Sequence, residues 1–312
     1  MTLVIKSGDE QAFLEWQESF AEFAPGLEVR FWSDPALDPE AIRYAMVWDP
    51  DPGRLAQFPN LKLISSSAAG VDHILRDPHL QRHLPLVRVT TSDTAQRMGD
   101  YVCWAALSLL RRIPEILVNQ AERGFDDNLN GESATETRVG VMGLGALGSR
   151  AAAMLAGLGF QTAGWSGSPK SIEGVESFAG AEALAPFLAR TDILVCLLPL
   201  TPATTGIICA ETIAQLPRGA GIVNVGRGGH VVDADLLAAL DSGHLKGAVL
   251  DVFHPEPLAK DHPYWAHPKV IVTPHVASFG SRRVRARHVA GVIAALERGE
   301  KLPGLYDPVR GY

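Results

Sequence analysis

A glycine-rich loop between an apolar strand and a helix constrains this chain more than any other feature. A short apolar stretch beginning at Val139 leads into the pattern G-x-G-x-x-G at Gly143, Gly145 and Gly148, and a helical stretch, 149–158, follows directly. The first glycine permits a tight turn, the second lets a backbone approach a pyrophosphate, and the third lets helix and strand pack closely. Free N–H groups at the start of the helix would face the phosphates. The loop therefore predicts a dinucleotide site, with a purely structural turn as the alternative.

Short apolar strands alternate with helical stretches along the whole chain, which indicates an α/β protein with parallel strands covered on both faces. Six strands are expected from the glycine loop onward, the count of a doubly wound dinucleotide fold, at 138–142, 162–165, 193–198, 221–225, 247–251 and 270–273. Earlier strands at 3–5, 29–32, 44–48 and 63–65 belong to a smaller unit. A long helical stretch, 94–121, interrupted by Pro114, and a last helix, 281–298, are the expected crossings between the two units. We expect a dinucleotide-binding domain, 96–284, inserted into a discontinuous substrate-binding domain, 1–95 and 285–312.

Composition excludes several classes of function. A net charge of −7 argues against a general nucleic-acid binder. The start of the chain has no basic segment followed by a long apolar run, and the one uncharged run of membrane-span length, 193–210, is broken by prolines and a glycine. The cysteines are too few and too scattered for a disulfide framework or a zinc site: Cys103, Cys196 and Cys209. We expect a cytoplasmic protein without nucleic-acid, membrane or metal partners.

The strand after the glycine loop bears on the choice between NAD and NADP. An NAD site normally has Asp or Glu about 20 residues after the loop. Here the stretch Trp165-Ser166-Gly167-Ser168-Pro169-Lys170 contains no acid, and the first one is Glu173. Hydroxyl groups and a lysine would suit a 2′-phosphate, so NADP(H) is the preferred cofactor and NAD(H) is the alternative. Lys170 could also be only a solvated loop residue.

Three later strands end in polar residues. Arg227 lies between glycines, Asp251 is followed by Glu256, and His275 follows the last strand. Ligands bind beyond the carboxyl ends of parallel strands, so these side chains are expected in one crevice. A guanidinium can clamp a carboxylate or keto oxygen, a histidine can protonate a carbonyl oxygen, and Glu256 can fix the tautomer of that histidine. Taken alone, each of these residues could have a purely structural role. Together with the glycine loop they predict hydride transfer to a 2-keto acid.

The chain resembles the D-isomer-specific 2-hydroxyacid dehydrogenase family over essentially its whole length. The stretches that carry the resemblance are 143–148, 198–204, 224–228, 247–257 and 273–278, and Trp165-Ser166, 174–180 and 310–312 resemble its glyoxylate/hydroxypyruvate reductase A branch. The resemblance implies a Rossmann sheet inserted into a flavodoxin-like domain, with Arg227 binding substrate, His275 donating the proton and Glu256 as its partner. It further implies cofactor contacts from the glycine loop, from Trp165, Ser166, Ser168 and Lys170, and from Ala146, Leu147, Leu198, Pro199, Val225, Gly226 and Asp251. The phosphate-binding Arg of that branch falls at Gly167.

The substrate side rests on small residues in the first unit. Ala69 and Gly70 resemble the family's loop whose backbone amides bind the substrate carboxylate, and small side chains permit that close approach. A plain strand-to-helix turn is the alternative. Trp48 resembles a pocket tryptophan of the branch, or is a core aromatic, and Met98 is favoured as interdomain packing. Two further groups are expected to be structural: His254, His262 and His267 in a surface loop rather than a zinc site, and Arg282, Arg283, Arg285 and Arg287 on a solvated face or in interdomain pairs.

These features together predict a reductase that converts small 2-keto acids, such as glyoxylate and hydroxypyruvate, to glycolate and D-glycerate with NADPH. The substrate is expected in a cleft between the two domains. Two rivals stay open: a reductase of bulkier 2-keto acids, and a catalytically silent nucleotide-sensing protein of the same fold. The resemblance also implies a homodimer, and an exposed apolar face on 101–110 would fit one.

Overall fold

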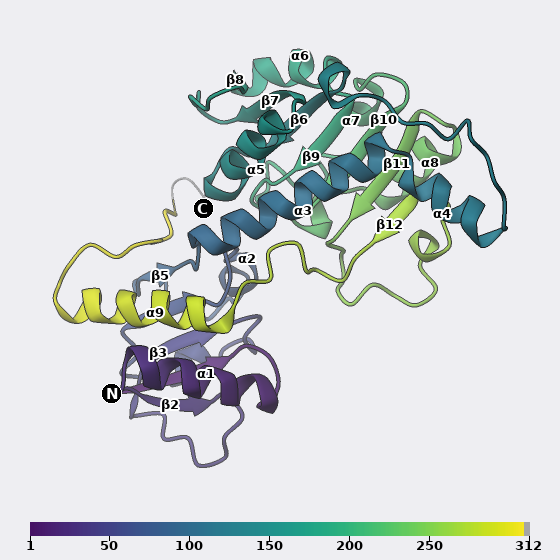
Figure 1. Ribbon diagram of the computed structural model, residues 1–312. Coiled ribbons are helices and arrows are strands. Elements are labelled where there is room, and N and C mark those ends of the chain that lie inside the picture. The colour runs from purple at the N-terminus through teal and green to yellow at the C-terminus, as the bar shows by residue number, and fades with distance from the viewer. Residues whose placement is uncertain (309–312) are drawn as a thin grey trace. The chain divides into compact units, whose positions relative to one another are not determined.

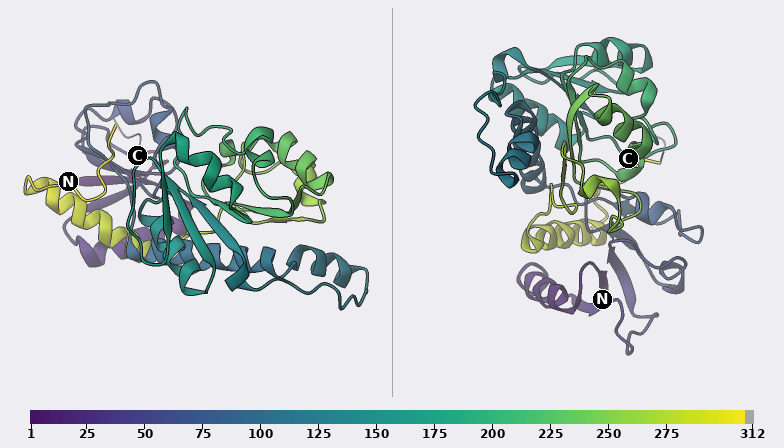
Figure 2. Two further views of the ribbon diagram at one scale, coloured as in Figure 1. Left: turned by 90° about the horizontal axis from the view of Figure 1, so that it is seen from above. Right: turned by 90° about the vertical axis from the view of Figure 1, so that its right-hand side faces the viewer.

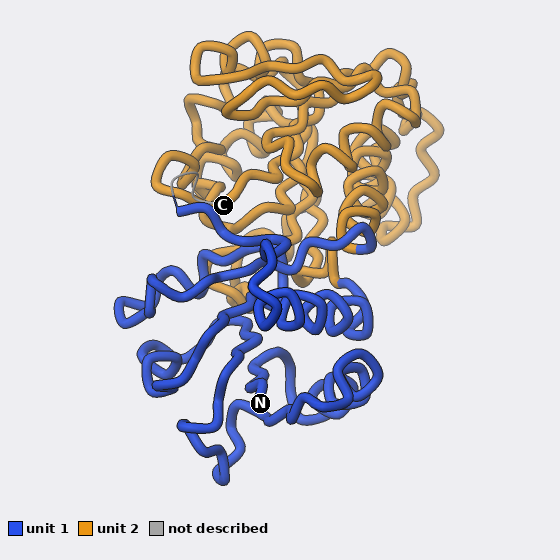
Figure 3. Tube along the Cα trace, turned by 90° about the vertical axis from the view of Figure 1, so that its left-hand side faces the viewer, with its two compact units in different colours: residues 1–93, 280–312 blue, residues 94–279 orange. Residues whose placement is uncertain are grey.

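The structure, a computed structural model, describes residues 1–308, so the 310–312 tail used in the resemblance lies outside the described residues. The chain divides into two compact units (Figure 3): unit 1 comprises residues 1–93 and 280–312, and unit 2 comprises residues 94–279. The domain limits expected from the sequence, 1–95 with 285–312 and 96–284, stay a prediction.

Unit 1 is built on a parallel sheet with the strand order β2-β1-β3-β4-β5, which is the flavodoxin-like order 2-1-3-4-5. Its strands are β1 (Thr2–Lys6), β2 (Glu28–Phe31), β3 (Ile42–Val47), β4 (Leu63–Ser66) and β5 (Leu86–Val87). Its helices are α1 (Glu10–Phe23), α2 (Asp72–Leu75) and α9 (Arg282–Glu297), with a 3₁₀ turn at Leu55–Gln57. Helices α1 and α9 pack on one face of the sheet, and the other face buries Phe58, Leu61 and Ile74.

The four arginines of α9 are held by α1 inside unit 1. Arg283 makes a two-pronged pair with Glu22, with distances of 2.8 and 2.5 Å, and Arg282 pairs with Glu15 at 2.5 Å. The guanidinium groups of Arg285 and Arg287 lie over the rings of Trp16 and Phe23. Arg283 and Arg287 are exposed, as expected for a solvated face, but Arg285 is buried. The ion pairs lie within unit 1 and are not interdomain pairs. The sequence does not reveal the partners because they lie more than 260 residues earlier in the chain.

Unit 2 is a seven-stranded parallel sheet with the order β12-β11-β10-β9-β6-β7-β8 (Figure 1). The chain starts at β6 in the middle, builds outward to β8, and then returns to β9 on the other side, as in a doubly wound dinucleotide fold. The strands are β6 (Arg138–Met142), β7 (Gln161–Ser166), β8 (Glu176–Ala179), β9 (Ile193–Cys196), β10 (Ala220–Asn224), β11 (Leu245–Leu250) and β12 (Val270–Val272). This order confirms the predicted Rossmann class.

Helices cover both faces of this sheet (Figure 2). One face packs against α3 (Ser92–Leu110) and α5 (Ala146–Gly157), the other against α6 (Leu184–Ala189), α7 (Ala210–Ala214) and α8 (Asp233–Asp241). The helical stretch expected over 94–121 is two helices, because Arg112 adopts a left-handed φ of 55° and α4 (Ile113–Ala121) begins there with Pro114 in its first turn. Short 3₁₀ turns lie at Ala134–Glu136, Ala181–Ala183, Gly228–His230 and Pro263–Trp265.

The described part of unit 2 has seven strands where the sequence predicted six. The missed strand is β8, which pairs only with β7 at the edge of the sheet and is partly exposed. Its sequence, Glu-Ser-Phe-Ala, has one large apolar side chain and shows none of the continuous apolar character of a buried parallel strand. In unit 1 the sequence also failed to predict β5, in this case because a two-residue strand is too short to leave an apolar pattern.

Candidate active site

The polar segments predicted from the sequence lie at the ends of six different strands of one parallel sheet. The glycine loop follows β6, the stretch 166–170 ends β7, Leu198 and Pro199 follow β9, and the remaining predicted residues follow β10, β11 and β12. Because all these strands run parallel, their carboxyl ends share one edge of the sheet. The topology therefore places the candidate residues of unit 2 along the edge where ligands bind in open α/β sheets.

The glycine loop has the geometry of a phosphate cradle. Gly143 has a φ of 98°, which disfavours any residue with a Cβ, and a Cβ on Gly148 would lie 1.8 Å from the carbonyl oxygen of Gly143. A Cβ on Gly145 would meet no protein atom within 4 Å, so the space beside it is open. Gly145 is the N-cap of α5, and the first amides of that helix, at Ala146 and Leu147, have no intrahelical partner. These groups fit a pyrophosphate.

The loop after β7 is shaped by its own hydroxyl groups. Ser166 donates its hydroxyl proton to the carbonyl of Ser168 at 2.8 Å, and the amide of Lys170 donates to Ser177 Oγ at 3.0 Å. Trp165, at the end of β7, donates from Nε1 to the carbonyl of Gly180. With the proton of Ser166 used inside the loop, the groups that could donate to a 2′-phosphate are the hydroxyl of Ser168 and the exposed ammonium of Lys170.

Arg227 is held in place by two residues that sequence reasoning missed. Asn224, fully buried at the end of β10, donates to the carbonyl of Arg227 at 2.9 Å. The amide of Arg227 donates to Nδ1 of His230 at 3.0 Å, so His230 carries its proton on Nε2 and donates to the carbonyl of Pro199 at 3.3 Å. His230 thereby ties the arginine to the loop after β9. The sequence offered one signal for this role, because His230 lies three residues after Arg227 in a glycine-rich turn.

His275 and Glu256 form a hydrogen-bonded pair. Nδ1 of His275 lies 2.8 Å from Oε2 of Glu256, and the other carboxylate oxygen accepts the amide of Phe253 at 2.9 Å. Burial alone would raise the pKa of Glu256, but the hydrogen bonds from His275 and Phe253 and the positive charges of His275 and Arg227 outweigh it and hold that pKa below its usual range. An ionised Glu256 fixes Nδ1–H as a donor and so sets the tautomer and the orientation of the imidazole.

Asp251, predicted as a cofactor contact, is buried beneath the His275 turn. It is 1% exposed, and its two carboxylate oxygens accept the backbone amides of Val276 and Ala277 at 2.9 Å each. Its contact with the cofactor stays a prediction, as do those of Leu198, Pro199, Val225 and Gly226, which lie at the carboxyl ends of β9 and β10.

The predicted substrate loop of unit 1 is braced by a buried histidine. His73 accepts the amide of Asp49 at Nδ1, so its Nε2 donates to the carbonyl of Gly70 at 3.2 Å, and the hydroxyl of Ser66 donates to the same oxygen at 2.6 Å. Within residues 1–308 the amides of Ala69 and Gly70 donate to no acceptor. The ring of Trp48 packs on His73 with 4.3 Å between centroids. The loop thus presents two fixed amide donors, which suits a carboxylate.

Other expected structural residues have structural partners. Within the described part of the chain, no group of three or more His, Cys, Asp or Glu side chains has the arrangement of a metal site. His262 caps the 3₁₀ turn at Pro263–Trp265, and His267 pairs with Asp241. Met98, expected to pack between the domains, is instead buried in the core of unit 2, because its position on α3 faces the sheet and α5. No helix among residues 1–308 is long and apolar enough to cross a membrane.

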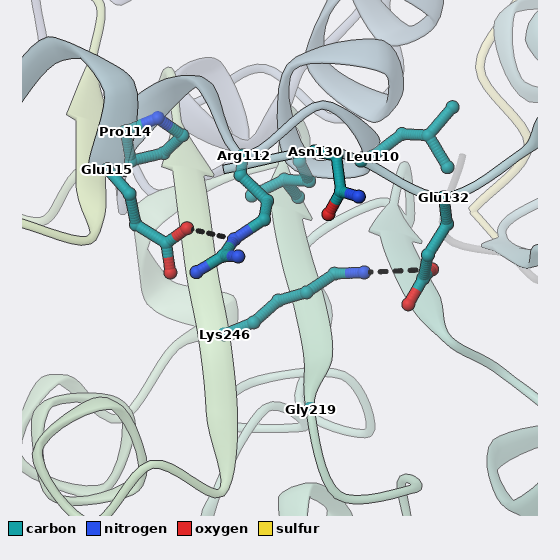
Figure 4. A pocket seen from close by; sticks show the side chains of 10 residues that line it. Leu110, Arg112, Pro114, Glu115, Asn130, Glu132, Gly219 and Lys246 are labelled. Atoms are coloured by element: carbon teal, nitrogen blue, oxygen red, sulfur yellow. Dashed lines mark hydrogen bonds and ion pairs between the residues drawn. The ribbon is translucent and has the colours of Figure 1, made fainter. Parts of the chain in front are cut away.

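A cavity of about 460 Å³ lies at the opposite edge of the sheet from these residues. Gly219 and Lys246, at the amino ends of β10 and β11, line it together with the junction of α3 and α4. Lys246 faces Glu132 across it at 3.5 Å, and Arg112 pairs with Glu115 (Figure 4). None of the predicted catalytic or cofactor residues lines this cavity, so it is separate from the candidate site.

Comparison with known proteins gives the same family over both units. Residues 103–277 match the D-isomer specific 2-hydroxyacid dehydrogenase, NAD binding domain. Glyoxylate/hydroxypyruvate reductase A of Serratia proteamaculans is 38% identical over 303 residues, 96% of each chain. A D-isomer specific 2-hydroxyacid dehydrogenase of Xanthobacter autotrophicus, solved with NADPH and MES, has a TM-score of 0.93 and 42% identity over 100% of this chain and 99% of its own.

A second solved structure is similar to the same extent. The NADPH-dependent glyoxylate/hydroxypyruvate reductase of Sinorhizobium meliloti, in complex with NADP and sulfate, has a TM-score of 0.91 and 40% identity over 100% of this chain and 99% of its own. The match of the cofactor-domain profile over more than half of the chain, and the identity to full-length relatives, agree with the glycine loop and the polar strand ends. The chain belongs to the D-isomer-specific 2-hydroxyacid dehydrogenase family.

Proposed function

We propose that the chain is an NADPH-dependent reductase of glyoxylate and hydroxypyruvate. The observation that carries the proposal is the hydrogen-bonded pair of His275 and Glu256, with Arg227 close enough for its charge to act on Glu256. This acid, its orienting carboxylate and a carboxylate-binding guanidinium lie on the sheet edge that also carries the glycine loop. The names of the Serratia and Sinorhizobium relatives support this substrate class, and the latter's NADP supports the cofactor.

The chain's own residues would hold the cofactor at the carboxyl edge of unit 2. The pyrophosphate would lie against the open side of Gly145 and the first amides of α5. Ser168 and Lys170 would hold the 2′-phosphate, with Trp165 and Ser166 shaping that loop. NADPH, when bound, supplies the hydride that reduces the keto carbon.

The substrate would be held through its carboxylate. Arg227 offers paired N–H donors, and its backbone is fixed from both sides by Asn224 and His230. Ala69, Gly70 and Trp48 of unit 1 stay predicted substrate contacts, and the two fixed backbone amides of that loop suit a carboxylate. Fixing the carboxylate orients the neighbouring keto group for reaction, which lowers the entropic part of the barrier.

His275 would donate the proton that the reduced carbonyl oxygen takes up. Its Nδ1–H donates to Glu256, so the acidic proton in the reaction is the one on Nε2. The negative charge of Glu256 stabilises the imidazolium before the transfer and keeps the ring in one orientation. Arg227 places positive charge where negative charge develops on the oxygen.

An initial-rate assay tests the proposal. NADPH and NADH would each be offered with glyoxylate, hydroxypyruvate, pyruvate and phenylpyruvate, and oxidation followed by absorbance. We expect the highest kcat/KM with NADPH and the two small substrates. A clear preference for phenylpyruvate would instead indicate a reductase of bulkier 2-keto acids. NADPH binding without turnover of any substrate would indicate a nucleotide-sensing protein.

We also propose that the protein acts as a cytoplasmic homodimer. The support for a dimer is an apolar face of unit 2 formed by Trp104 and Leu107 of α3 and by Leu158, all of them exposed and lining one shallow hollow. Exposed large apolar side chains grouped on one face are typical of an interface between proteins.

A further inference from the structure

One buried carboxylate holds the turn that carries His275. His275 has a φ of 54°, in the left-handed region that residues other than glycine rarely adopt. The backbone carbonyl of Asp251 accepts the amide of His275 at 2.8 Å, and its carboxylate accepts the next two amides, of Val276 and Ala277. The direction of the His275 side chain therefore depends on the position of the Asp251 carboxylate.

A second chain of hydrogen bonds fixes that carboxylate from helix α3. Thr273 donates its hydroxyl to Oδ1 of Asp251 at 2.5 Å, and the same hydroxyl oxygen lies 2.5 Å from the phenol oxygen of Tyr101. A threonine hydroxyl has one proton, which here goes to Asp251, so Tyr101 must be the donor to Thr273. Burial raises the pKa of the Tyr101 phenol, which keeps that donor protonated.

We propose that Tyr101 is a positioning residue for the reaction, acting through Thr273 and Asp251 to hold the left-handed turn at His275. The inference rests on the proposed role of His275 as proton donor. Tyr101 lies 172 residues before Thr273, and its ring packs edge-on against Trp104 of the same helix at 5.1 Å. Because Tyr101 acts on the direction of the proton donor and not on ligand binding, its loss should lower kcat and leave cofactor affinity unchanged.

Three variants isolate the two hydroxyls. Tyr101→Phe keeps the ring packing and removes one hydroxyl, Thr273→Val keeps the shape of the side chain and removes the other, and Thr273→Ser restores a hydroxyl. We expect kcat for glyoxylate to fall about fivefold in Tyr101→Phe and at least as much in Thr273→Val, as for the loss of one hydrogen bond. Thr273→Ser should stay within about twofold of wild type, and the NADPH dissociation constant, from fluorescence titration, should not change in any of them.

Tyr44→Phe is the matched control. Tyr44 is a buried tyrosine of unit 1 whose hydroxyl donates to Glu297 at 2.7 Å, and neither residue is a predicted site residue. Its loss should lower the melting temperature and leave kcat unchanged. If Tyr101→Phe changed the melting temperature as Tyr44→Phe does but kept wild-type kcat, its role would be structural and the inference wrong.

The double variant Tyr101→Phe/Thr273→Val shows whether the two hydroxyls act through one series of hydrogen bonds or independently. Because the phenol acts only through Thr273, the double variant should lose about as much kcat as Thr273→Val alone. A loss equal to the product of the two single effects, or equal rates for Thr273→Val and Thr273→Ser, would overturn the proposal. If wild type did not reduce glyoxylate with NADPH, or His275→Ala kept its rate, the proposed function would fail instead. An inactive His275→Ala beside a full-rate Tyr101→Phe contradicts only the role of Tyr101.

Discussion

The Glu256 carboxylate shows how single residues set the chemistry of the candidate site. Its pKa is lowered although burial acts in the opposite direction, because two hydrogen bonds and two positive charges favour the ionised form. A group with a lowered pKa contributes its stabilisation above its ordinary pKa and loses it as the pH falls through the lowered value. Glu256 therefore stays ionised at neutral pH and orients His275 there.

Replacing that charge should slow the reaction while the cofactor still binds. We expect Glu256→Gln to lower kcat for glyoxylate at neutral pH by about tenfold or more, since a neutral amide does not stabilise an imidazolium. The measurement is NADPH oxidation under saturating cofactor, with the exposed Glu211→Gln as the matched control. An unchanged kcat in Glu256→Gln would remove Glu256 from the mechanism.

Gly167 gives a prediction about cofactor choice. A Cβ at this position would meet no atom within 4 Å, and its φ is not in the left-handed region, so a long side chain fits. Gly167→Arg adds a guanidinium at the position where the resemblance to the reductase branch implies one, and it should raise kcat/KM for NADPH by about tenfold relative to NADH. Gly167→Glu is the matched control and should shift the ratio towards NADH by repelling a 2′-phosphate. Equal ratios in both variants would place the 2′-phosphate elsewhere.

Residues with distinctive chemistry at strand ends could be identified from the sequence, but the residues that hold them in place through hydrogen bonds could not. Arg227, Glu256 and His275 were identified because cationic, acidic and imidazole groups follow predicted strands. His230 and Thr273 were not identified, since their roles depend on contacts with Pro199 and Asp251 in other loops. For Asp251 the sequence indicated the right edge of the sheet but not that its carboxylate is buried by backbone amides.

At the scale of elements, an ion pair joins the starts of two central strands. Arg138 begins β6, and Asp192 precedes β9; the guanidinium donates to both carboxylate oxygens at 2.8 and 2.6 Å, and the Arg138 amide donates at 2.9 Å. Burial alone would raise the pKa of Asp192. The three hydrogen bonds from Arg138 and the nearby positive charges outweigh burial, so the pKa is lowered. The pair fixes the register of β6 and β9, between which the order of the sheet reverses.

Removing that carboxylate should destabilise unit 2 in a pH-dependent way. We expect Asp192→Asn to lower the free energy of unfolding at pH 7 by about 1–2 kcal/mol, a value reduced for the partial exposure of the pair. Because the pKa of Asp192 is lowered in the folded state, the difference from wild type should persist above about pH 4 and shrink below it. Thermal melts between pH 3 and pH 7 measure this. A stability difference between wild type and Asp192→Asn that grew as the pH fell would contradict this prediction.

The predicted elements succeeded where apolar runs were long and failed where they were short. All six strands predicted in the second series exist, with ends shifted by a few residues, because each carries a run of apolar residues; most of them are buried, and the edge strand β12 is half-buried. Strands β8 and β5 were missed because a half-exposed or two-residue strand leaves little apolar pattern. The break between α3 and α4 lies just before Pro114, as the first-turn preference of proline explains.

At the scale of the whole molecule, the apolar face formed by Trp104, Leu107 and Leu158 carries a prediction about assembly. Replacing Trp104 and Leu107 together by glutamate would place two charges on this face, and we expect the variant to sediment as a single chain where wild type sediments as two. Burying unpaired charges at an interface is costly, so the dimer should dissociate. The control is a charge placed on the exposed Val232. A wild-type protein that sediments as one chain at all concentrations would refute the dimer.

The two-sheet architecture was predictable as a class, because alternating strands and helices with one glycine loop allow few arrangements. The strand order within each sheet became known only from the structure, since strands as similar as Leu63–Ser66 and Ile193–Cys196 carry no mark of their neighbours. The ion-pair partners of the α9 arginines were likewise not predictable, because Glu15 and Glu22 look like ordinary surface acids in the sequence.

The most direct test of the central claim is a comparison of wild type and His275→Ala in turnover and in cofactor binding. We expect wild type to oxidise NADPH with glyoxylate, and His275→Ala to lose at least about a hundredfold in kcat, because general acid catalysis contributes at least that much. The NADPH dissociation constant should be the same for both, because the glycine loop and the 166–170 loop are untouched. A His275→Ala variant that reduced glyoxylate at a near-wild-type rate would contradict the account.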